Sequence, residues 1–72
     1  MADLELLTVV ALTHDMPEAG LVRGQVGTIV EVLSPGVFEV EFSDDNGRTY
    51  ASVALKPQDL LRLHHAPLHE AA

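Results

Sequence analysis

Residues 37–42, "VFEVEF", show the clearest strand pattern in the chain. Phe38, Val40 and Phe42 alternate with Glu39 and Glu41. A period of two places the first set on one side of an extended strand and the second set on the other. The stretch therefore predicts a half-buried strand whose inner side is apolar and whose outer side is acidic.

Turn-forming residues divide the rest of the chain into four more short strands. We expect strands at residues 8–13, 26–33, 48–55 and 60–63, because these runs are rich in β-branched and aliphatic residues and end at turn formers. The intervening residues 14–24 contain two glycines and a proline, which predicts a long irregular loop. We expect Leu21 and Val22 to pin this loop to the core.

Glycine and proline mark the expected turns. Pro35 and Gly36 suit a tight hairpin turn with a left-handed second corner, and the pair Asn46-Gly47 predicts another hairpin. Residues 56–59 include a proline, which ends a strand and suits one 3-10 or helical turn. Gly24 lets the long loop turn into the next strand.

The strand expected at residues 26–33 requires an assignment of its two sides. We expect the even-numbered residues to face the core, so that Val30 joins Phe38, Val40 and Phe42. The odd-numbered residues then face outward, and Gly27 marks a bulge, a bend or the close approach of another backbone. The inward set is Val26, Thr28, Val30 and Val32, and the outward set is Gly27, Ile29, Glu31 and Leu33.

Together these elements predict an all-β fold. Five short strands, a long first loop, two hairpins and one helical turn before the last strand are the parts of a small SH3-like barrel. We expect one barrel domain over residues 1–64 and a C-terminal tail over residues 65–72. With 72 residues and no cysteine, the chain holds itself by packing or by assembly.

The charge balance limits the classes of partner that suit this chain. Four Lys and Arg residues oppose eleven Asp and Glu residues, for a net charge of −7. A nucleic acid is therefore an unfavourable partner, because its binders draw affinity from neutralised phosphates.

The start lacks a secretion signal, and no run is long enough to span a bilayer. We expect a cytoplasmic protein with no membrane contact.

Two resemblances extend this interpretation. "RGQVGTIVEV" followed by "GVFEVEF" resembles the KOW-type segment of ribosomal and transcription proteins, although the basic loops that grip RNA are absent. From about residue 6 to residue 63 the chain is similar to the bacterial domain-of-unknown-function family numbered 4926, with its V-V-A-L start and its D-x-P-E-x-G-L, G-x-V-G-T-I-V-E-V and E-V-E-F segments. That resemblance implies an SH3-like barrel, no catalytic residues to transfer, and an accessory or antitoxin-like role.

No residue pattern points to catalysis, a metal or a cofactor. His65 and His69 have a spacing that would put two ligands on one helical face, but Pro67 lies between them and opposes that helix. Glu39 and Glu41 form a carboxylate pair, yet acid-base catalysis needs such a pair in a pocket, and a barrel this small is filled by its own side chains. We therefore expect no enzymatic activity, no metal site and no cofactor.

These observations favour a module that binds another protein. We expect the contact face at Ile29, Glu31, Leu33, Val37, Glu39 and Glu41, where apolar residues are ringed by acids. Two alternatives stay open. One is a KOW-like binder of RNA or ribosomes, and the other is a homo-oligomeric accessory subunit.

Overall fold

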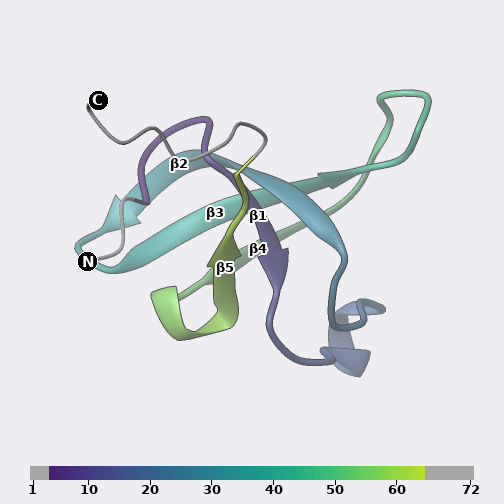
Figure 1. Cartoon of the computed structure of the whole chain (residues 1–72), viewed down its shortest axis with the longest axis horizontal. Coiled ribbons are helices and arrows are strands. Elements are labelled where there is room, and N and C mark those ends of the chain that lie inside the picture. The colour runs from purple at the N-terminus through teal and green to yellow at the C-terminus, as the bar shows by residue number, and fades with distance from the viewer. Residues whose placement is uncertain (1–3, 65–72) are drawn as a thin grey trace, which may run out of the picture.

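The computed structural model describes residues 4–64, and this part of the chain is all-β (Figure 1). It holds five strands and two single-turn 3-10 helices, one in the long first loop and one before the last strand. The all-β class is therefore confirmed. In chain order the elements are β1 (Val9–Leu12), η1 (Pro17–Ala19), β2 (Val26–Ser34), β3 (Val37–Ser43), β4 (Thr49–Leu55), η2 (Pro57–Asp59) and β5 (Leu60–Arg62).

All five strands join one antiparallel sheet in the order β4-β3-β2-β1-β5. β2, β3 and β4 form a meander of sequence neighbours, whereas β1 pairs with β5 from the other end of the described chain. In Figure 1, β1 and β5 run at a steep angle to β3. Within residues 4–64 the two edge strands, β4 and β5, do not pair with each other, so the sheet is open between them.

The inner side of the sheet carries an aliphatic and aromatic core. β3 alternates as the sequence predicts, since Phe38, Val40 and Phe42 are buried while Glu39 and Glu41 are only half-buried. The long loop contributes Leu21, which is 1% exposed, but Val22 is exposed and does not pin the loop. The buried hydrophobic cluster is Val10, Leu12, Leu21, Ile29, Phe38, Val40, Phe42, Leu55 and Leu60.

The side assignment predicted for β2 is wrong. Ile29 is fully buried and lies opposite Val40, so it belongs to the core and not to a contact face. Val30, which we expected inside, is exposed. Val26 and Val32 are exposed as well, and Thr28 is only half-buried.

Two neighbouring strands decide which side of β2 is inside. Gly27 lies between Val10 of β1 and Phe42 of β3. A Cβ on Gly27 would lie 2.7 Å from Cγ1 of Val40 and 2.8 Å from the carbonyl oxygen of Glu41, so only glycine fits. Apolar residues of both parities in this strand left the sequence pattern ambiguous, and this close approach resolves it.

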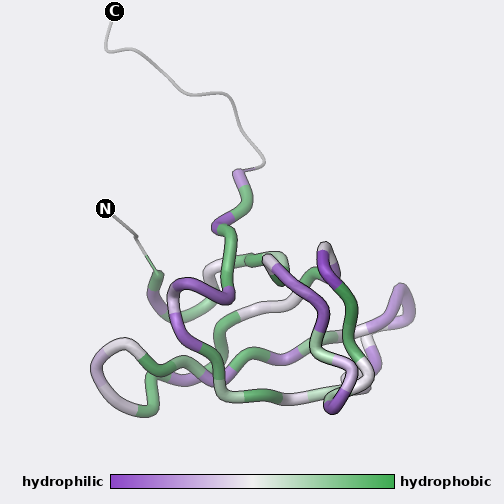
Figure 2. The backbone as a smooth tube through the Cα atoms, turned by 90° about the horizontal axis from the view of Figure 1, so that it is seen from below, coloured by the Kyte–Doolittle hydropathy of each residue, from purple (hydrophilic) through white to green (hydrophobic). Residues whose placement is uncertain are grey.

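The turns lie where the sequence places them. Pro35 and Gly36 form the turn between β2 and β3, and Gly36 adopts the left-handed φ of +78° that favours glycine. Gly24 and Gly47 also have positive φ values. Figure 2 shows hydrophilic residues gathered at the turn between β3 and β4, and hydrophobic residues along the strands.

The predicted tail, with His65 and His69, lies outside the described residues. Among residues 4–64, no helix has the length and apolar character that crossing a bilayer requires.

Candidate protein-binding site

The hairpin of β2 and β3 extends past the end of β1, which pairs with the other edge of β2. β1 pairs with β2 only from Val26 to Thr28. Two further backbone hydrogen bonds end this shared stretch, one from the Leu7 N–H to the Ile29 carbonyl at 2.7 Å and one from the Ile29 N–H to the Thr8 carbonyl at 3.0 Å. Beyond it, β3 is the strand of the described chain that pairs with β2. We call residues 30–38 the distal hairpin.

The distal hairpin exposes apolar side chains. Val30 is 38% exposed, Val32 47% and Leu33 46%, while Val37 is half-buried. The register between β2 and β3 shifts twice, between Ile29 and Glu31 and again before Ser34, so that β2 carries extra residues there. Such bulges interrupt the simple in-and-out alternation of side chains. Figure 2 shows the hydrophobic flanks of this turn.

Carboxylates accompany these apolar side chains. Glu31 on β2 lies directly opposite Glu39 on β3, and Glu41 lies opposite Thr28. The hydroxyl of Ser52 on β4 donates a hydrogen bond to the Glu39 carboxylate. Residues 24–47 contain no Lys, Arg or His. This surface is therefore negative, and like charges face each other across the strand pair.

The structure separates the six residues expected at the contact face. Glu31, Leu33 and Val37 lie on the distal hairpin, and Glu39 directly follows it, so these four residues lie together. Glu41 lies further along β3, and Ile29 is buried in the core. Val30 and Val32 are also exposed on this hairpin, although the sequence pattern assigned both residues to the interior. Their exposure follows from the short reach of β1 and from the bulges, neither of which has a signal in the sequence.

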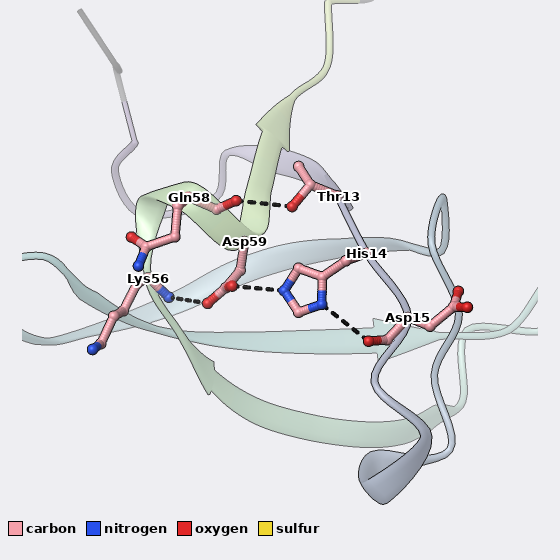
Figure 3. A network of polar contacts seen from close by, with 6 residues as sticks. All are labelled: Thr13, His14, Asp15, Lys56, Gln58 and Asp59. Carbon is pink, nitrogen blue, oxygen red and sulfur yellow. Dashed lines mark hydrogen bonds and ion pairs between the residues drawn. The ribbon is translucent and has the colours of Figure 1, made fainter.

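A second polar arrangement joins two segments that lie 45 residues apart (Figure 3). His14, at the start of the long loop, directs Nε2 to the Asp59 carboxylate of η2 at 2.7 Å. Its Nδ1 lies 3.0 Å from the backbone carbonyl oxygen of Asp15. The Thr13 hydroxyl donates to the Gln58 carbonyl at 2.8 Å. No pattern in the sequence predicts this contact, because the two segments share no motif.

The charge state of His14 follows from its partners. Both partners accept hydrogen bonds, so both contacts form together only when the ring is a doubly protonated imidazolium. The hydrogen bond to Asp59, and then the one to the Asp15 carbonyl, raise the His14 pKa above 6.5. Partial burial opposes ionisation of Asp59, but the bonds from His14 and from the Lys56 backbone N–H lower its pKa below 3.8 overall. When His14 is protonated, the contact is an ion pair that anchors the loop to η2.

A third feature is an open hollow of about 210 Å³ beside the start of β1, lined by residues 5–9 and 62–63. Its charged lining residues are Glu5 and Arg62. Across residues 4–64, no three His, Asp or Glu side chains gather as a metal site would need.

Comparison with known families identifies the family of this chain. Residues 6–62 match the family described as Domain of unknown function (DUF4926). The chain belongs to this family. The match confirms the resemblance drawn from the V-V-A-L, D-x-P-E-x-G-L and G-x-V-G-T-I-V-E-V segments. No curated protein and no solved structure matches the chain.

Proposed function

We propose that this protein is a non-enzymatic module that binds another protein through the distal hairpin. One observation carries the proposal: Val30, Val32 and Leu33 are exposed on a hairpin that extends past β1, beside carboxylates and without a basic residue. Clustered exposed apolar side chains rimmed by polar ones are typical of contact sites.

The charge of the hairpin specifies the kind of partner. Glu31 and Glu39 face each other with no cation between residues 24 and 47 to compensate them. A partner with an apolar centre and a basic rim would bury the exposed side chains and relieve the repulsion between the two carboxylates. The charges would mainly set orientation and association rate, and the apolar contacts would set affinity.

We also propose that the sheet is a half-open SH3-like barrel. The strand order β4-β3-β2-β1-β5, the long loop between β1 and β2, and the 3-10 turn before β5 support this arrangement. The absence of cysteine in the sequence suits a cytoplasmic location. An accessory or antitoxin-like role beside a partner protein fits a small acidic module of 72 residues.

The test is a quantitative pull-down from cytosol with surface variants of the full chain. We expect Leu33→Asp and Val32→Asp to reduce capture of the partner about tenfold, since each removes an apolar contact and adds a charge. Val22→Asp, at a similarly exposed site on the long loop, is the matched control and should leave capture unchanged. Equal capture by all three variants would overturn the proposal.

The two alternatives give different results. A KOW-like RNA binder would show affinity for mixed RNA that falls steeply with salt. A homo-oligomeric subunit would show a mass in sedimentation that rises with concentration and drops in Leu33→Asp. Either result would replace the proposed partner class.

A further inference from the structure

The two edges of the sheet differ in how well they are protected. β5 has three residues and carries Arg62. Short length and charge are devices that keep edge strands from pairing with other chains. β5 is therefore a poor template for a further strand.

β4 has none of these devices. Its seven residues, "TYASVAL", include no charged residue and no proline. From Ala51 to Leu55 it pairs with β3 without a register shift. Alternate residues of such a strand direct their backbone N–H and C=O groups away from the neighbouring strand. Within residues 4–64, no strand pairs with β4 on that side.

The two sides of β4 differ in chemistry. Ala51 and Val53 lie on the inner side, packed against the hydrophobic core and half-buried. Ser52 and Ala54 lie on the outer side and are exposed. Each of these small residues pairs with a glutamate of β3, Ser52 with Glu41 and Ala54 with Glu39. The path from the β4 edge to these two carboxylates is therefore lined by small side chains.

We propose that the free edge of β4, residues 51–55, takes up an extended strand of a partner protein whose residues alternate between apolar and basic. Main-chain hydrogen bonds to β4 would hold the added strand, and alternate side chains would give specificity. Apolar side chains would continue the inner side beside Ala51 and Val53. Basic side chains would lean across Ser52 and Ala54 toward Glu41 and Glu39.

Charge favours such a peptide over a second copy of this chain. Each copy has a net charge of −7, so a dimer through β4 would bring two negative chains together. An added strand lies about 5 Å from β4 and about 10 Å from β3. A lysine or arginine on the added strand would approach the Glu39 and Glu41 carboxylates. The stretch that carries these two residues, 24–47, contains no basic residue. The inference goes beyond the proposed function, because the β4 edge is a second surface, separate from the distal hairpin.

The first experiment uses a synthetic eight-residue peptide of alternating Lys and Val, and a control peptide with four Lys followed by four Val. We expect the alternating peptide to bind at least about tenfold more tightly. Amide hydrogen exchange should slow on β4 and stay unchanged on β5. N-methylation of alternate peptide residues along one edge should weaken binding about tenfold, and along the other edge should have no effect.

Several results would overturn the inference. Equal affinity for the two peptides would mean attraction by charge alone. Protection outside β4, or no binding at peptide concentrations of about 1 mM, would remove the site. If the protein sediments as a dimer and its β4 amides exchange slowly without peptide, the edge is occupied by a second copy of the chain.

Variants of the full chain separate this inference from the proposed function. Ala54→Lys should weaken the alternating peptide and Ala54→Glu should strengthen it, because residue 54 is exposed on the outer side of the edge strand. Leu33→Asp, on the distal hairpin, should leave peptide binding unchanged. If Leu33→Asp abolishes partner capture while both Ala54 variants bind the peptide as the parent does, the β4 inference fails and the proposed function stands.

Discussion

β2 and β3 share one ladder but bury their side chains differently. Along β3, buried and half-buried residues alternate from Val37 to Phe42. Along β2, alternation holds only from Val26 to Ile29, and every residue from Val30 to Ser34 is exposed. β3 has a partner strand on each edge, whereas β2 loses β1 after Thr28. Burial along a strand is thus set by its neighbours as much as by its own sequence.

The contrast has a functional consequence within β2 itself. Its first half forms part of the core, where Gly27 and Ile29 are buried. Its second half forms the distal hairpin, where the apolar residues lack cover from the described chain. One strand therefore serves stability at one end and the proposed binding at the other, and substitutions a single position apart should differ widely in their cost to stability.

The largest expected effect comes from Ile29→Asp, compared with Val30→Asp. Ile29 is fully buried, so a carboxylate there should cost about 4 kcal/mol or more of unfolding free energy. That is enough to unfold most of a domain of this size. Val30 is exposed, so Val30→Asp should cost less than about 1 kcal/mol. Urea unfolding followed by circular dichroism measures both. Similar losses in the two variants would contradict the division of β2.

Gly27→Ala should be the next largest effect. The new Cβ would lie under 3.0 Å from Val40, Glu41 and Phe42, and the Glu41 contact is with the backbone. We expect a loss of about 3 kcal/mol, because the β2–β3 pair would have to separate locally. Gly36→Ala is the matched control. Its Cβ meets open space, and its left-handed φ should cost only about 1 kcal/mol. Thermal unfolding of the two variants gives the order, and a reversed order would refute the close approach.

Glu31→Lys should have a smaller effect of the opposite sign. It converts the facing Glu31 and Glu39 pair into opposite charges, which should stabilise the hairpin by about 0.5 kcal/mol at low salt. The gain should fade as salt is added. Urea midpoints at two salt concentrations test this. A loss of stability would mean that the two side chains do not face each other in solution.

The contact of His14 with Asp59, which lies outside β2 and β3, should give the smallest effect on stability. Because the His14 pKa is raised above 6.5, its contribution to stability is full below pH 6.5 and is lost as pH rises through the folded-state value. Stability measured from about pH 5 to about pH 8.5 should therefore fall slightly more in the parent than in His14→Gln. A fall as large as the Ile29→Asp loss would mean that the loop, and not the β2–β3 ladder, holds the fold.

The sequence predicts well wherever a local pattern decides the structure. The alternation of Phe38, Val40 and Phe42 predicts both the strand and its buried side. The turns at Gly36 and Gly47 follow from the left-handed backbone that glycine accepts. The start of each strand is predicted to within one residue.

Sequence patterns fail to predict the structure where contacts between distant segments determine it. Both parities of residues 26–33 are largely apolar, so only the backbone approach at Gly27 selects Ile29 for the core. The short reach of β1 exposes Val30 and Val32, and no residue of β2 encodes that reach. The pairing of His14 with Asp59 depends on the fold as a whole, which brings the first loop to the 3-10 turn before β5.

The pairing of β1 with β5 implies an order of assembly. β2, β3 and β4 meet their partners across tight turns, so their loops close at little entropic cost. Val10 reaches Arg62 only across most of the described chain. The meander should therefore form early, and β1 and β5 should dock last and open first. This small protein would then open and close reversibly at one end of its sheet, where two strands from opposite ends of the described chain lie side by side.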